Sequence, residues 1–241
     1  MTRHLPLLII LIACFAASAP SQTAFPPTNR DWEIALFGGR SSLGEKQYAT
    51  PVLGQGQEAP RAVRVRYAGG AQLGFRIAEN RWDHWGAQFE YSLSNQPLSI
   101  GNLSPDTPSI GLSHRIHRFM YDVLYYPFER SSRFRPFAFA GAGVSLFHIG
   151  DSSRTDAGAQ GIKLQDSWKL TFGWGGGLKY LIQDQIAVSF QIGDHVTDQP
   201  AYGLPSSARV TGNQFIPGLQ PDGYRHNWLL SLGFVYQWGE R

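Results

Sequence analysis

Apolar and polar residues alternate in eight separate runs between residues 31 and 238, and the gaps between them are long and short in turn. Alternation with a period of two gives a β-strand one apolar and one polar face. A helix would need apolar residues three and four positions apart, and these runs lack that spacing. The predicted strands cover 31–39, 61–77, 82–94, 113–128, 135–149, 166–182, 185–193 and 224–238. This rhythm predicts an all-β fold, an eight-stranded antiparallel up-and-down barrel.

The four long connections are rich in Gly, Pro, Ser, Asn and Gln, as loops are. They cover 40–60, 95–112, 150–165 and 194–223. In transmembrane barrels, long connections are extracellular loops and short ones are periplasmic turns. The pattern therefore predicts a transmembrane barrel with long extracellular loops and short periplasmic turns.

Aromatic residues near the strand ends support a membrane location. Trp228 and Trp238 lie ten residues apart on one face of the last strand. At about 3.3 Å per residue and a tilt near 40°, they span roughly 25 Å, the height of an outer-membrane apolar band. Aromatic residues gather where such a band meets the two membrane interfaces. The predicted aromatic belt comprises Trp85, Trp168, Tyr180, Trp228 and Trp238.

The N-terminus has the features of a secretory signal peptide. A short basic start precedes the apolar segment 5–17, and small residues suitable for cleavage follow it. We therefore expect residues 1–21 to be a signal peptide, 22–30 a short periplasmic segment and 31–241 one barrel domain. Cys14 is the single cysteine, so the chain forms no intrachain disulfide. Its context is similar to a lipoprotein cleavage site, but the apolar run continues past it, which favours a passive cysteine over a lipidated one.

Composition excludes several classes of function. The net charge is +3 and Lys and Arg form no dense stripe, so no nucleic-acid partner is expected. His114 and His117 lie three residues apart, so they point to opposite faces of a strand and cannot bind one metal ion there. Residues 173–177 are glycine-rich but lack the Gly-Lys-Ser/Thr ending of a phosphate loop. We expect neither a metal nor a cofactor.

Charged residues on the polar face of the predicted strands are expected to point into the barrel. They are Arg64, Arg66, Arg76, Glu90, Arg118, Asp122, Lys169 and Lys179, with Glu33 as a further candidate. The interior of an eight-stranded barrel is just wide enough for side chains. Charges in such a narrow, low-dielectric space need partners. We therefore predict an internal ion-pair network that plugs the lumen, with glycines on the same face leaving room for it. A narrow, selective pore is the alternative.

Two glycine-rich and aromatic strands in tandem carry a family resemblance. Arg135-Pro136-Phe137 leads into Gly141-Ala142-Gly143-Val144, and Gly173-Trp174-Gly175-Gly176-Gly177-Leu178-Lys179-Tyr180 follows. The chain resembles the small outer-membrane β-barrel family, the OmpA/OmpX-like eight-stranded barrels. The resemblance implies a bacterial outer-membrane location and insertion by the barrel-insertion machinery. Such barrels often end on an aromatic residue, whereas here Gly239-Glu240-Arg241 follow Trp238. No peptidoglycan-binding domain is expected after the last strand.

Two other interpretations remain open. Lipid A deacylases are also small outer-membrane barrels and carry a His-x-Ser pair near a late strand. His195 and Thr197 have the same spacing and could act as base and nucleophile, although threonine replaces serine and no acid is placed to complete the site. A soluble barrel of the lipocalin type would instead turn its apolar face inward, but so many tryptophans and other aromatics would overfill eight strands.

The sequence favours a structural or surface-interaction role over catalysis. We expect a rigid, plugged barrel that displays four mobile outer loops, because binding residues usually lie on loops held by a rigid scaffold. Within the longest loop, 203–221 is the candidate interaction surface. The expected partners are outer-membrane lipid and lipopolysaccharide, the insertion machinery and an extracellular ligand at the loops.

Overall fold

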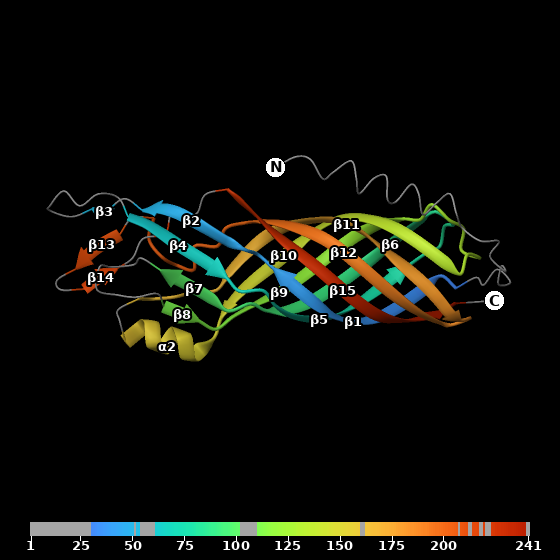
Figure 1. Ribbon diagram of the computed structural model, residues 1–241, viewed down its shortest axis with the longest axis horizontal. Coiled ribbons are helices and arrows are strands. Elements are labelled where there is room, and N and C mark those ends of the chain that lie inside the picture. The colour runs from blue at the N-terminus through green and yellow to red at the C-terminus, as the bar shows by residue number, and fades with distance from the viewer. Residues whose placement is uncertain are drawn as a thin grey trace.

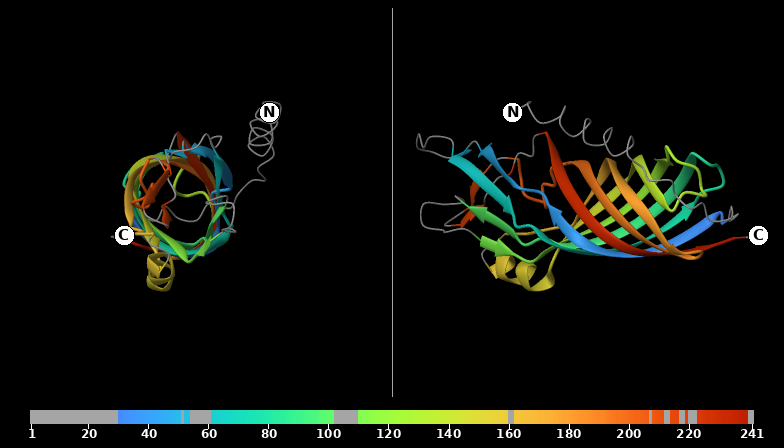
Figure 2. Two further views of the ribbon diagram at one scale, coloured as in Figure 1. Left: turned by 90° about the vertical axis from the view of Figure 1, so that its left-hand side faces the viewer. Right: turned by 45° about the vertical axis from the view of Figure 1, so that its right-hand side comes forward.

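The computed structural model describes residues 30–50, 52–53, 61–101, 110–159, 162–206, 208–211, 214–216, 219 and 223–239. Its eight long strands are β1 (Trp32–Ser42), β5 (Gly70–Glu79), β6 (Trp85–Asn95), β9 (His114–Tyr125), β10 (Phe134–Ile149), β11 (Ser167–Gln183), β12 (Ile186–Asp198) and β15 (Tyr224–Trp238). They form a closed barrel in the order β1-β15-β12-β11-β10-β9-β6-β5, in which every neighbouring pair is antiparallel (Figures 1 and 2). The predicted all-β barrel is confirmed.

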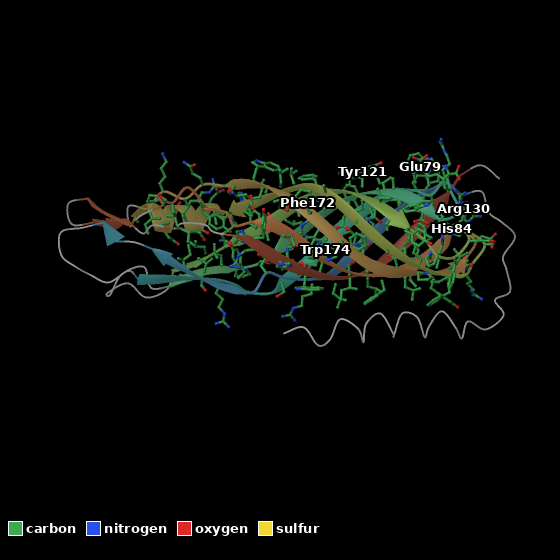
Figure 3. All side chains as sticks on the ribbon, turned by 90° about the horizontal axis from the view of Figure 1, so that it is seen from above. Glu79, His84, Tyr121, Arg130, Phe172 and Trp174 are labelled. Carbon is green, nitrogen blue, oxygen red and sulfur yellow. The ribbon has the colours of Figure 1, made fainter. Side chains whose placement is uncertain are left out.

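Large apolar side chains cover the outer wall of the barrel. Leu36, Leu73, Leu170 and Leu232 come from four different strands, and each is at least 65% exposed. Figure 3 marks Tyr121, Phe172 and Trp174 on the barrel wall, and all three are exposed. The side chains that face the lumen are mostly polar or charged. This arrangement is the reverse of a lipocalin-type barrel, which encloses its apolar face.

The two ends of the barrel differ. Residues 80–84, 126–133 and 184–185 make short connections at one end, here called the turn end. All the remaining strands and the helix lie at the opposite end, here called the loop end (Figure 1). One sheet there has the order β2-β4-β7-β8 and another has the order β14-β13-β3.

The loop-end elements are β2 (Glu45–Thr50), β3 (Val52–Leu53), β4 (Arg61–Tyr67), β7 (Leu98–Gly101), β8 (Ile110–Leu112), β13 (Ala208–Thr211), β14 (Gln214–Ile216) and helix α2 (Asp151–Ala159). Among the described residues, no helix is long and apolar enough to span a membrane.

The loop end has its own apolar core. Its buried members are Leu43, Val65, Tyr67, Leu98, Ile100, Leu112, Ile116, Phe147, Ile149, Ala157, Ile162, Leu164, Tyr202, Leu204 and Leu219. We call the elements around this core the cap. Within the candidate surface 203–221, Leu204 and Leu219 are buried in this core, so these two side chains face inward.

The predicted strand 61–77 is in fact two strands. β4 pairs with β2 and β7 in the cap, whereas β5 pairs with β1 and β6 in the barrel. Ala68 and Gly69 separate the two strands, and this break reverses which alternate residues face inward. Gly70 allows the change of direction, because a Cβ atom there would lie 1.5 Å from the carbonyl oxygen of Asn95. A local break is enough to exchange the two faces of a period-two strand.

The glycines of β11 make room for aromatic rings rather than for long charged side chains. A Cβ atom on Gly175 would lie 2.6 Å from the ring of Phe139, and one on Gly177 would lie 2.4 Å from the ring of Phe137. Both rings point into the lumen from β10. The alternation of β10 is weak because its inward face carries aromatic residues as well as polar ones. The glycines of β11 do leave space inside the barrel, as predicted. Phenylalanine rings occupy that space, whereas the prediction assigned it to charged side chains.

Candidate functional site

The lumen near the turn end is closed by a buried ion pair, here called the turn-end layer. The ammonium of Lys179 pairs with Glu33 and donates a hydrogen bond to the Tyr126 hydroxyl at 2.7 Å. Gln237 donates to the second carboxylate oxygen of Glu33 at 2.7 Å. The Arg135 guanidinium lies 3.6 Å from the centre of the Tyr126 ring. Both charges of the pair are therefore neutralised across the width of the barrel.

A second set of buried charges, here called the central layer, lies further along the lumen. Arg76 forms a salt bridge with Glu90 at 2.6 Å, and it donates to Ser231 at 2.9 Å. The same guanidinium lies 3.7 Å from the centre of the Phe37 ring. Because a narrow interior has a low dielectric, such pairing is what makes these charges tolerable there.

Asp122 and Arg118 complete the central layer. Gln88 donates a hydrogen bond to Asp122 at 3.3 Å. Arg118 is 1% exposed and lies on the same inward face of β9 as Asp122. Five of the predicted interior charges, Arg76, Glu90, Arg118, Asp122 and Lys179, are therefore buried inside the barrel.

The cavity between these two layers is very small. Its lining includes Glu33, Lys179, Arg76 and Gln88. The space open to the centres of water molecules there is about 10 Å³, which is the room that one ordered water needs. The lumen at this level holds side chains rather than a continuous water column.

A chain of hydrogen bonds, here called the mouth chain, crosses the barrel where the cap begins. Arg225 donates to the Gln199 amide oxygen, and the Gln199 amide nitrogen donates to Tyr67 at 3.2 Å. The Tyr67 and Tyr202 hydroxyls are 2.7 Å apart, and Tyr202 lies 3.1 Å from Nε2 of His114.

The direction of the mouth chain follows from its two ends. Nδ1 of His114 lies 3.0 Å from the backbone carbonyl of Gln96, which can only accept. Arg225 can only donate. With a neutral His114, every link therefore donates in the same sense, from Arg225 to the Gln96 carbonyl. This ordered chain holds Tyr202 in the barrel mouth.

The remaining predicted interior charges are elsewhere. Arg66 is exposed on β4, outside the barrel, because the break at Ala68 and Gly69 sends β4 into the cap. Arg64 also belongs to β4, and its side chain lies outside the described residues. Lys169 lies near the loop-end start of β11 and is half-buried. The prediction that Arg66 points into the barrel was therefore wrong, and the strand that carries Arg64 lies in the cap.

The hydrolase candidates face the lumen. His195 and Thr197 both lie on the inward face of β12 and are 1% and 2% exposed. The Thr197 hydroxyl contacts the backbone carbonyl of Asp198 at 3.5 Å, and Nδ1 of His195 has no hydrogen-bond partner among the described residues. A base and a nucleophile for a membrane lipid would have to face the lipid, and these two side chains do not.

His114 and His117 lie in different places in the structure. His114 is buried in the mouth chain, whereas His117 lies on the outer wall and contacts the Tyr91 hydroxyl at 2.9 Å. In the part of the chain that the structure describes, no group of three His, Cys, Asp or Glu residues is arranged to hold a metal ion.

The predicted belt residues all lie on the outer wall. Trp85, Trp168, Tyr180, Trp228 and Trp238 are each between 38% and 60% exposed. Trp238 pairs with Trp32 at the turn end, and Trp228 pairs with Ser42 ten positions along β15.

Sequence reasoning missed the mouth chain and much of the turn-end layer. Its overlooked members are Tyr67, Gln96, His114, Tyr126, Arg135, Gln199, Tyr202 and Arg225. Arg225 and Arg135 lie on inward positions of predicted strands, so strand parity could have identified them. Tyr202 and Gln199 come from a connection, where no periodic signal exists.

A family model described as an outer membrane protein beta-barrel domain matches residues 7–234. Among solved structures, the outer membrane protein OprG from Pseudomonas aeruginosa is similar, with 16% identity over 90% of this chain and 100% of OprG and a TM-score of 0.56. The outer membrane protein AlkL is 15% identical over 92% of this chain and 96% of AlkL, with a TM-score of 0.49. No curated protein sequence gives a match.

The likeness to OprG shows a shared fold, and the family match covers nearly the whole chain. The outward apolar wall and the closed strand order agree with the likeness to OprG and with the family match. The chain therefore belongs to the outer membrane protein β-barrel domain family, and it is a protein of the bacterial outer membrane.

Proposed function

We propose that this protein is a plugged scaffold that presents the folded cap at the cell surface, rather than an open channel or a hydrolase. The observation that carries the proposal is the filled lumen. The turn-end layer, the central layer and the mouth chain cross the barrel at three successive levels. The cavity between the first two levels holds no more than about one water molecule.

The cap supports the surface-interaction half of the proposal. Its described residues have a buried apolar core, and the mouth chain attaches it to the barrel. Ordered connections on a rigid scaffold are where binding residues are usually found. The alternative, a pore, would require the side chains of all three levels to leave the lumen together.

Bilayer conductance tests the plug. Purified protein inserted into planar phosphatidylcholine bilayers is expected to give no stable current above that of bare bilayers. A mock preparation from cells that lack the protein is the control for contaminating porins. Stable, unitary conductance steps that appear only with the protein would show that the lumen conducts and would end the scaffold proposal.

Thiol labelling of whole cells tests the orientation of the cap. Lys163→Cys places a thiol at the loop end, and Arg81→Cys places one at the turn end. Both native side chains are exposed. A membrane-impermeant maleimide should label only the first variant on intact cells and both after lysis. The parent chain, whose single cysteine is Cys14, gives the background. Labelling of only the Arg81→Cys variant on intact cells would mean that the cap faces the periplasm.

A further inference from the structure

The outer wall changes from apolar to basic over a few residues of β9. Phe119 faces outward and stacks on Trp168 of β11, with ring centres 6.5 Å apart. The next outward positions toward the loop end are His117 and Arg115, and Arg115 is exposed. An apolar wall that ends in aromatic rings marks the edge of the hydrocarbon region, and polar headgroups lie just beyond it.

Titratable side chains continue from this edge toward helix α2. His148 of β10 is opposite Arg115 in register, and its ring centre lies 6.3 Å from that of His117. Asp166 accepts from Nδ1 of His148 at 3.0 Å, and it also pairs with Arg154 of α2. The wall of the barrel and the helix are therefore connected by one polar cluster.

Arg154 also lines a groove next to helix α2. Its lining is Arg154, Gly158, Ile162, Lys163 and Leu164, and its volume is about 280 Å³. Ile162 and Leu164 are buried members of the cap core, so they make an apolar floor. Figure 2 shows α2 outside the ring of strands, beside the barrel rather than over its mouth.

Cations on β9 and at the groove have unused binding capacity. Within the described part of the chain, neither Arg115 nor Lys163 forms an ion pair, and Nε of Arg154 is buried without a hydrogen-bond partner. The acidic residues of the helix, Asp151 and Asp156, are exposed and do not line the groove.

We propose that this outer-wall patch, Arg115, His117, His148, Arg154 and Lys163, binds the phosphorylated sugar headgroup of lipopolysaccharide. Three features select this ligand. The patch begins where the apolar wall ends, so a lipid whose acyl chains lie against Phe119 and Trp168 brings its headgroup to the cations. Arg and Lys side chains match phosphate by charge and by hydrogen-bond geometry. The groove has room for a sugar, which a small lipid headgroup would leave largely empty.

Competition between two lipids in one sample tests the site. The protein is reconstituted in phosphatidylcholine nanodiscs that contain equal amounts of bis-phosphorylated and dephosphorylated lipid A. Bound lipids are then counted by native mass spectrometry. Because nanodiscs expose both leaflets, the result is independent of how the protein is oriented in the cell. The wild-type protein should retain the phosphorylated form preferentially.

Three variants make the test specific. Arg115→Gln and Lys163→Gln together should lower the preference for phosphorylated lipid A by about tenfold or more, since each basic residue near a membrane surface contributes to anionic lipid binding. Arg81→Gln removes one exposed cation at the turn end and should keep the wild-type preference. Lys163→Gln alone changes a residue outside the strands. If the double variant does not fold, this single variant takes its place in the competition experiment.

Three results would overturn the site. The first is a wild-type protein without preference for the phosphorylated form. The second is an equal loss of preference in Arg81→Gln, which would mean that binding follows net charge. The third is equal retention of phosphatidylglycerol in a parallel nanodisc sample, which would mean that any anionic lipid suffices.

Discussion

Lys179 shows how a single charge is accommodated inside this barrel. Its ammonium and the Glu33 carboxylate are both almost fully buried, and they neutralise each other across the lumen. Lys179 also donates to the Tyr126 hydroxyl, and Gln237 donates to Glu33. Removing one member of a buried pair leaves the other charge desolvated and unpaired, which costs more than removing both.

We expect Lys179→Met to lower the free energy of unfolding by about 3–5 kcal/mol, because Glu33 keeps its charge without a counter-ion. The double variant Glu33→Gln with Lys179→Met should be closer to wild type. The measurement is urea unfolding in phosphatidylcholine vesicles, followed by tryptophan fluorescence. Lys163→Met, at an exposed lysine, is the matched control. A single variant as stable as wild type would show that the pair does not hold the lumen closed.

At the scale of elements, the carboxylate of Asp166 links α2 to barrel strand β10 by hydrogen bonds. It accepts from His148, from Arg154 of the helix and from the backbone nitrogen of Ile149 at 3.0 Å. Burial raises the pKa of Asp166, but the hydrogen bonds from His148, Arg154 and Ile149 outweigh it and hold the pKa below the ordinary value of 3.8. A carboxyl group whose pKa is lower in the folded than in the unfolded protein stabilises the fold at pH values above its unfolded-state pKa. This stabilisation is lost as the pH falls through the folded-state pKa.

We therefore expect α2 to detach locally in acid while the barrel stays closed. Hydrogen exchange, corrected for intrinsic rates, should show protected amides in residues 151–159 at pH 7 and lost protection well below pH 3.8. Asp166→Asn should lose the same protection at pH 7, because the neutral amide no longer attracts Arg154. Asp156→Asn changes an exposed carboxyl on the helix and should behave as wild type. Unchanged protection in Asp166→Asn would show that packing of the cap core alone holds the helix.

At the scale of the whole molecule, closure of the sheet leaves no free edge. Each of the eight barrel strands is paired on both sides, from β1–β15 round to β1–β5. In a closed barrel, the backbone hydrogen bonds of each strand are made to its two neighbours. Detergent therefore does not readily separate a single strand from the sheet. Unfolding must break the ring as a unit.

We expect the membrane-fraction protein to migrate at two positions in SDS gels, faster when unboiled and slower after boiling. The folded barrel is more compact than the unfolded chain, and only heat opens it. Boiled and unboiled samples of a water-soluble protein provide the control for gel artefacts. Identical migration of both samples, together with recovery in the soluble fraction, would contradict a closed barrel in the membrane.

Local alternation was sufficient to place most of the eight barrel strands and to separate the two faces of each strand. Each inward or outward position depends only on the parity of a residue within its own strand. The alternation, together with the bulk of the aromatic residues, therefore places Trp168 and Trp228 outside the barrel and Arg76, Glu90 and Asp122 inside it. In the structure the two tryptophans are exposed and the three charged side chains are buried. Parity fails only where the strand breaks, as at Ala68 and Gly69, and that break moved Arg64 and Arg66 out of the barrel.

Which side chains meet was decided by the tertiary structure alone. Glu33 and Lys179 are 146 positions apart, and they touch because ring closure and strand register bring β1 and β11 to the same level of the lumen. Tyr202 reaches His114 and Tyr67 from a connection that carries no periodic signal. The sequence by itself determined the barrel and its two faces, since these follow from the geometry of one strand. The plug, the cap core and the outer-wall patch depend on contacts between distant strands, so only the closed fold decided them.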